Sequence, residues 1–181
     1  MANHPAGTIF VLRSKGFVGW SIRLLTRSGV NHAGVCNGEG DTVEAQAAGA
    51  VVKVEPGRGK DVTYGDALLA RIAQEDPHRG TAIAQAAELL VGTPYNFLDL
   101  VALAWACRHD PTGVPERPNW WQRRVMRSDR LICSQLVDKA CLMEGVHLFD
   151  DGRLPGQVTP GALETVLAND DWPIVIDRLG G

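Results

Sequence analysis

The sequence predicts an α+β fold in which an antiparallel sheet packs against helices. Segments typical of strands cluster early in the 181 residues and segments typical of helices late, and one strand returns at the end. This separation differs from the regular alternation of strands and helices that builds parallel sheets. The length fits one domain, so we expect residues 1–181 to form a single domain.

Five segments of the first half are predicted to be strands. They are residues 8–12, 31–36, 42–46, 51–55 and 67–72. The first is β-branched and apolar, as in a buried strand. The second and third flank Asn37-Gly38, which favours a hairpin turn because both residue types tolerate positive φ. The leucines and alanines of the fifth would also suit a helix.

Apolar residues at helical spacing mark most of the remaining chain. The predicted helices cover residues 17–25, 79–91, 97–107, 119–126, 133–144 and a last piece that begins at Thr159. Gly145 suits a C-terminal cap, and Pro160 suits the first turn of the last helix. Residues 108–118 are rich in proline and predict a loop long enough to be a functional flap, and residues 173–177 close the chain as a strand.

Composition and charge exclude several functional classes. A formal net charge of -3 argues against a general nucleic-acid binder, which needs a basic surface. No apolar run approaches the roughly 20 residues of a transmembrane helix. Residues 1–8 lack the charged start and apolar centre of a signal peptide, so we expect synthesis in the cytoplasm, with secretion by another route left open.

The four cysteines are irregularly spaced. They are Cys36, Cys107, Cys133 and Cys141. The chain is too long to depend on a disulfide framework, and no closely spaced pair of the kind that binds zinc occurs. We therefore predict no metal and no cofactor.

Cys133 stands out because the chain is predicted to turn into a helix at this residue. Unpaired backbone N–H groups and the positive end of the helix dipole collect at such a position. Both favour the thiolate, which is the reactive form of cysteine. A buried core cysteine fits the position equally well.

His32 and Glu44 form a candidate base and orienting carboxylate. If the hairpin turn centres near Gly38, the two residues lie opposite each other on the same face. A carboxylate there would fix the imidazole tautomer and stabilise the imidazolium, as the third member of a catalytic triad does. A slip of one residue would place Glu44 on the other face, where it would only pair with a strand neighbour.

Tyr95 follows Gly92-Thr93-Pro94 just after a predicted helix. Its hydroxyl could donate a hydrogen bond to a developing oxyanion, beside the backbone N–H of Cys133. A buried tyrosine with a satisfied hydroxyl is the alternative interpretation.

Several segments together resemble the permuted NlpC/P60, papain-like cysteine hydrolases of the YiiX/LRAT type. Asn31-His32-Ala33-Gly34-Val35 with Val43-Glu44-Ala45 resembles their histidine hairpin, Gly92-Thr93-Pro94-Tyr95 their tyrosine turn, Cys133-Ser134-Gln135-Leu136-Val137 their nucleophile helix, and Val158-Thr159-Pro160-Gly161 their late segment. Histidine precedes cysteine, which is the permuted order. The resemblance spans about residues 8–163.

The resemblance implies a circularly permuted papain-like fold, with the base on the strand layer and the nucleophile on a helix. It makes Cys133 the nucleophile, His32 the base and Glu44 the orienting residue. It also makes Tyr95 and Ser134 candidate substrate or oxyanion residues. The implied enzyme is a thiol hydrolase, of the peptidase or amidase type, that cleaves an amide or ester bond through an acyl-enzyme.

The implied substrates are peptides, peptidoglycan-derived peptides or lipid-like esters. Many members of this family that act on the cell wall carry an export signal, and none is found here. A phage-encoded or host-lysis protein would reconcile cytoplasmic synthesis with a cell-wall substrate. An acyltransferase on the same fold, with a lipid pocket near Trp105 and Trp120-Trp121, is one alternative function. A non-catalytic binding module is another. The sequence leaves the oligomeric state open.

Overall fold

The computed structural model describes residues 4–14, 23, 28–46, 49–54, 64–72, 78–95, 131–149, 151–153, 155–168 and 174–179. The helices predicted at 97–107 and 119–126 and the loop predicted at 108–118 lie outside these residues. The helix predicted at 17–25 lies outside them too, apart from Arg23.

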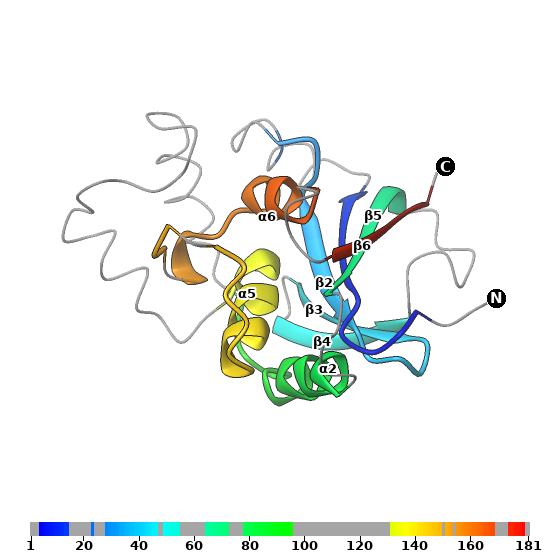
Figure 1. Cartoon of the computed structure of the whole chain (residues 1–181), viewed down its shortest axis with the longest axis vertical. Helices are drawn as coiled ribbons and strands as arrows, with labels where there is room; N and C mark the ends of the chain where they lie inside the picture. Colours follow the sequence, from blue (N-terminus) through cyan, green and yellow to red (C-terminus); the bar gives the residue numbers. More distant parts are fainter. Residues whose placement is uncertain are drawn as a thin grey trace.

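The described strands form one antiparallel sheet in the order β4-β3-β2-β1-β5-β6 (Figure 1). The strands are β1 (Ile9–Ser14), β2 (His32–Cys36), β3 (Asp41–Gln46), β4 (Gly49–Val54), β5 (Tyr64–Ile72) and β6 (Ile174–Leu179). Each predicted strand is confirmed to within a few residues. The ambiguous segment, β5, is a strand because it pairs with β1 on one side and with β6 on the other.

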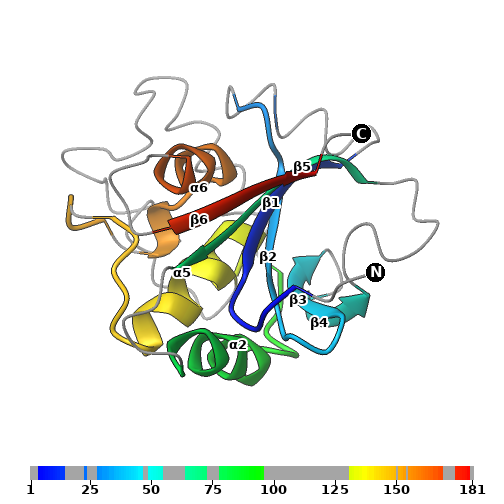
Figure 2. The same ribbon diagram turned by 45° about the vertical axis from the view of Figure 1, so that its right-hand side comes forward.

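The described helices are α2 (Arg79–Leu89), α5 (Cys133–Met143) and α6 (Pro160–Leu167), with a short 3-10 helix, η1 (Pro155–Gln157). Helices α2 and α5 pack against each other, and both contact β2 and β3 (Figure 2). The sequence did not predict η1, because three residues are too few to show a period. None of the helices in the described part of the chain is long and apolar enough to cross a membrane.

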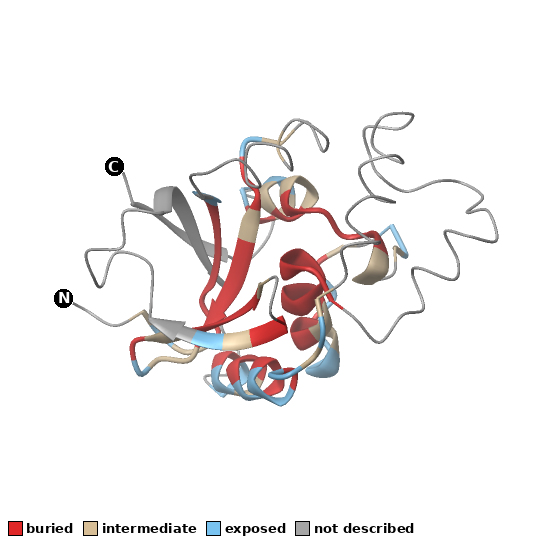
Figure 3. Cartoon of the chain, turned by 180° about the vertical axis from the view of Figure 1, so that it is seen from behind, coloured by how far each residue is buried: buried red, intermediate tan, exposed pale blue. Residues whose placement is uncertain are grey.

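The main core lies between the sheet and the helices, whose buried sides face each other in Figure 3. The strands contribute Ile9, Val11, Ala33, Val35 and Val43, and α5 contributes Leu136, Val137 and Ala140. The other face of the sheet carries a smaller buried cluster of Phe10, Leu12 and Cys36. Because β1 is buried on both faces, residues 9–12 read as a continuous apolar run without alternation.

The turn between β2 and β3 is longer than the predicted two-residue hairpin. Gly38 and Gly40 both have positive φ, 87° and 96°, and the side chain of Asn37 accepts hydrogen bonds from the N–H groups of Glu39 and Asp41. Cys36 pairs with Thr42, so the turn centres on Glu39. The predicted centre near Gly38 is therefore wrong by one residue, and this moves every cross-strand partner by two.

The N-terminal cap of α6 yields a stability prediction. The hydroxyl of Thr159 accepts a hydrogen bond from the N–H of Ala162 at 3.0 Å. We expect Thr159→Ala to lower the free energy of unfolding by about 1 kcal/mol, because one helix N–H loses its partner. Thr165→Ala, at an exposed position of the same helix, is the control, with an expected change within about 0.5 kcal/mol. Urea denaturation measures both, and equal effects would contradict the capping role.

Candidate catalytic site

His32 and Glu44 lie on neighbouring strands and are joined by a short contact. The Nε2 atom of His32 is 2.7 Å from Oε2 of Glu44. The direct strand partner of Glu44 is Gly34, so His32, two residues before Gly34 on β2, is a diagonal neighbour. The prediction that the two side chains share a face is confirmed, whereas the prediction that they stand directly opposite is wrong by two residues. A shift of two residues in the strand pairing keeps a side chain on the same face of the sheet, because successive side chains along a strand point to alternate faces.

Glu44 is fully buried, and its carboxylate is surrounded by donors from its own strand. The hydroxyl of Thr42 donates to Oε1 at 2.9 Å, and the amide of Gln46 donates to Oε2 at 3.0 Å. Burial alone raises the pKa of Glu44, but the hydrogen bond and positive charge of His32, helped by Gln46 and Thr42, hold it below its usual value. The carboxylate therefore stays ionised in the core.

Cys133 is the first residue of α5, as the sequence predicted. Its sulfur lies 3.9 Å from the main-chain oxygen of Asn31, the residue that precedes β2. The helix tip thus meets the sheet where β2 begins, beside His32. Cys133 is only 3% exposed as a residue, whereas the side chain of His32 is 14% exposed.

The electrostatics of His32 link it to both partners. Burial on its own lowers the pKa of His32. Hydrogen bonds to Cys133 and Glu44, together with their negative charges, outweigh burial and raise the pKa to about 10. Since Glu44 binds Nε2, the other ring nitrogen, Nδ1, is the one left to exchange a proton with the thiol. The structure thus brings Cys133, His32 and Glu44 together at one site.

Tyr95 also lies at this site. It forms a parallel bridge with Leu131, two residues before Cys133, and the preceding turn is tied to β4 through hydrogen bonds between Ala50 and both Gly92 and Thr93. Burial raises the pKa of the Tyr95 hydroxyl, and the charge of Cys133 raises it further. The phenol is therefore a neutral hydrogen-bond donor near the sulfur.

The side chain of Ser134 is bound to the main chain of Val158. It is fully buried, and its hydroxyl donates to the main-chain oxygen of Val158 at 2.7 Å. Gln135 behaves similarly: its side chain accepts from the N–H of Ile132 and donates to the carbonyl of Gly156. These contacts fix the start of α5 to residues 156–158.

Sequence reasoning missed the supporting roles of Thr42, Gln46 and Gln135. The strand period could have revealed the first two, because they stand two residues before and after Glu44 on the same face. The spacing of Ile132 and Gln135 resembles that of a capping box, but Ile132 has no capping side chain, so the motif was not visible.

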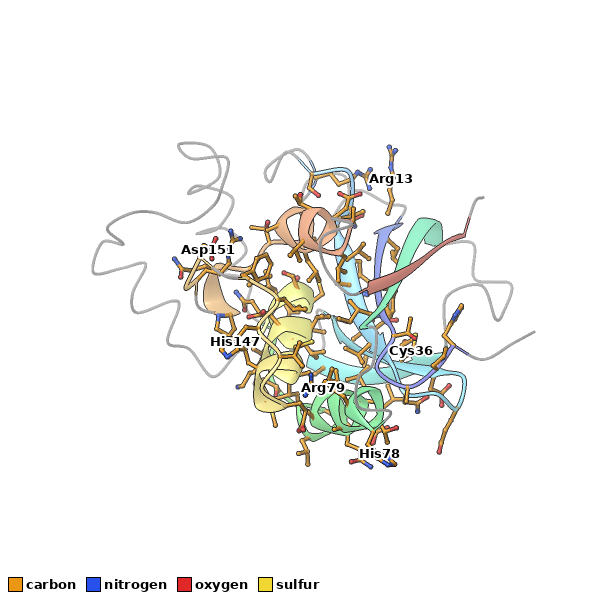
Figure 4. All side chains as sticks on the ribbon, in the orientation of Figure 1. Arg13, Cys36, His78, Arg79, His147 and Asp151 are labelled. Carbon is orange, nitrogen blue, oxygen red and sulfur yellow. The ribbon has the colours of Figure 1, made fainter. Side chains whose placement is uncertain are left out.

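A second group of charged residues lies along α5, away from this site. Asp138 is buried, and burial raises its pKa to about 6 although Arg153 and His147 act to lower it. Arg153 pairs with Asp151 and lies over the ring of Phe149, 4.2 Å from its centroid. In Figure 4, His147 and Asp151 lie beside α5 on the side away from the sheet. Cys36, which is on strand β2, lies on the opposite side of α5.

Comparisons with known proteins support the fold. No protein-family model matches the sequence, and comparison with curated proteins gives no significant match. Among solved structures, the chain is similar to the crystal structure of metalloprotein yiiX from Escherichia coli O157:H7, of the group DUF1105. The TM-score is 0.60 at 18% identity, over 98% of this chain and 97% of that one. At this identity the likeness establishes a shared YiiX-like α+β fold.

The buried pair of His32 and Glu44 predicts a pH-dependent stability. We expect Glu44→Gln to lower the free energy of unfolding on the order of 3 kcal/mol, because the imidazolium loses its counter-charge. The folded-state pKa of His32 is raised to about 10, so this stabilisation is full below the unfolded pKa of about 6.5 and is lost as the pH rises through 10.

Chemical denaturation at a series of pH values measures this loss. Glu144→Gln, which removes an exposed carboxylate at the end of α5, is the control, and we expect little change from it. A Glu44→Gln deficit that does not shrink at alkaline pH would contradict the ion pair.

Asp138 predicts a destabilising charge, in contrast to the stabilising pair of His32 and Glu44. Its folded-state pKa of about 6 exceeds the reference 3.8, so its charge opposes folding increasingly as the pH rises from about 4 through 6. We expect Asp138→Asn to be more stable than the wild type at neutral pH and equal to it in acid. Asp151→Asn should instead be less stable at neutral pH, because the ion pair to Arg153 lowers the pKa of Asp151. Thermal unfolding across this range tests both, and a destabilised Asp138→Asn would contradict the assignment.

Proposed function

We propose that this chain is a thiol hydrolase that cleaves amide or ester bonds through an acyl-enzyme. The observation that carries the proposal is the buried contact chain from Cys133 through His32 to Glu44, with the sulfur at a helix N-terminus. The likeness to yiiX supports the fold on which we place it. We further propose that the fold is a circularly permuted papain-like domain, since the base on β2 precedes the nucleophile on α5.

The other described cysteines lie in different surroundings. Cys141 lies on the same helix but is fully buried, and burial together with Asp138 raises the pKa of its thiol. Cys36 is fully buried in the small cluster with Phe10 and Leu12. A reactive cysteine needs both a base and a positive field, and Cys133 has His32 and the start of α5.

In the proposed reaction, the thiolate of Cys133 adds to the substrate carbonyl carbon, and the electron pair of the C=O bond moves to oxygen. The N–H groups at the start of α5 and the hydroxyl of Tyr95 stabilise this oxyanion. The side chain of Ser134 takes no part, since it is bound to Val158. When the C=O bond re-forms, the bond to the leaving amine or alcohol breaks and protonated His32 supplies its proton.

Deacylation reverses the role of His32. The neutral imidazole takes a proton from water while the water oxygen attacks the thioester carbon. Collapse of this second intermediate breaks the C–S bond, releases the carboxylic acid and restores the thiolate and imidazolium. Glu44 stays ionised and orients the ring throughout, as its buried hydrogen bonds favour.

The proposal involves no metal. The yiiX protein is described as a metalloprotein, but among the residues described for this chain no three His, Cys, Asp or Glu side chains gather as a metal ion requires. These described residues therefore do not fit a metal, and the proposed chemistry uses the thiol, the imidazole and the carboxylate.

The proposal predicts which variants lose activity towards an activated ester such as p-nitrophenyl acetate. We expect Cys133→Ala and His32→Ala to reduce turnover at least about 10³-fold, because each removes a member of one catalytic unit. Cys36→Ala and Cys141→Ala are the matched controls and should keep most of the activity. Circular dichroism checks that each variant is folded.

Alkylation by iodoacetamide gives a second, substrate-free measure. Peptide mass spectrometry should find Cys133 alkylated first among the described cysteines at neutral pH, and His32→Ala should slow this reaction about tenfold or more. A folded Cys133→Ala variant with wild-type turnover would overturn the proposal. Products formed with an added amine or alcohol acceptor would separate hydrolysis from acyl transfer.

A further inference from the structure

Phe10 packs directly onto the backbone of the strand that carries His32. Phe10 on β1 pairs with Gly34 on β2, and its side chain is fully buried. A Cβ atom at Gly34 would lie 2.5 Å from Cζ and 2.7 Å from Cε1 of the phenyl ring. A Cβ atom does not approach a non-bonded carbon atom this closely, so the ring occupies the space that a side chain at residue 34 would need.

The same ring faces the proposed base. The ring centroids of Phe10 and His32 are 6.3 Å apart, and the planes are inclined by 60°. This is the tilted geometry that aromatic pairs prefer. Gly34 is also the direct strand partner of Glu44, so the phenyl ring covers the backbone between the imidazole and its carboxylate.

The contact with Phe10 restricts the orientation of the His32 imidazole, which its position on the strand does not fix. The residue is the first of β2, and its imidazole is partly exposed, so the strand alone leaves the ring free to turn towards solvent. Glu44 holds only one ring nitrogen. The contact with Glu44 fixes one point on the ring, and the tilt of the ring about that point decides how well the other nitrogen meets the sulfur of Cys133.

We propose that Phe10 is a positioning residue: its ring, seated on Gly34, sets the tilt of the His32 imidazole between Glu44 and Cys133. The catalytic consequence rests on the function proposed above, whereas the positioning itself does not. Small misplacements of a reacting group reduce rates by up to about 100-fold, so a side chain that never touches the substrate can control turnover.

Phe10→Leu in the full chain is the main test, because leucine keeps an apolar side chain but removes the ring. We expect turnover of p-nitrophenyl acetate to fall about tenfold to 100-fold through kcat, with KM nearly unchanged. In NMR spectra, the Cε1–H signal of His32 should lose the ring-current shift from Phe10, and its titration midpoint should fall. Iodoacetamide should alkylate Cys133 more slowly.

Ile83→Val is the matched control, since it removes buried volume from α2 in the main core and should leave the His32 signal and titration unchanged. Gly34→Ala is a harsher variant, because its Cβ would also lie 2.8 Å from the main-chain oxygen of Val43 and strain the sheet.

A Phe10→Leu protein that loses stability but keeps the wild-type His32 titration and Cys133 alkylation rate would overturn the proposal. If the wild type does not hydrolyse the ester, the proposed function fails, and the NMR titration still decides the positioning role.

Discussion

The site depends on one constraint, which is that an ionised carboxylate can stay buried only if its hydrogen bonds are satisfied. Glu44 is fully buried, and its neighbours Thr42 and Gln46 on β3 donate to it from the same face. On β2, the imidazole of His32 is a further partner of this carboxylate. The register of the β2–β3 hairpin therefore fixes the position of His32, and the turn centred on Glu39 fixes that register.

The second half of the chain brings the sulfur to this hairpin. Ser134 and Gln135 tie the first turn of α5 to Val158 and Gly156, so the helix cannot slide along the sheet without breaking buried hydrogen bonds. Gly161 on α6 packs closely against Ser28, because a Cβ atom at residue 161 would lie 2.8 Å from the Cβ and Oγ atoms of Ser28. This contact brings α6 against the segment that leads into β2. Residues distant in sequence thus hold Cys133 and His32 together.

Much of this arrangement could be predicted from the sequence because it follows from local periodicity. The strands, the start of α5 at Cys133 and the shared face of His32 and Glu44 all depend on patterns of a few residues. The diagonal pairing could not be predicted, because the hydrogen bonds of Asn37 lengthen the turn and a two-residue template misses them. The contacts of Gln135 with Gly156 and of Phe10 with Gly34 depend on tertiary packing, which one sequence does not reveal.

The central claim is that Cys133 and Glu44 together keep His32 protonated. The most direct measurement is the NMR titration of the His32 imidazole in the wild type and in Cys133→Ala. The account predicts that the wild-type imidazole titrates with a midpoint of about 10, well above the midpoint of an ordinary histidine. It also predicts that this midpoint falls clearly in Cys133→Ala. An ordinary midpoint of about 6.5 in both proteins would contradict it.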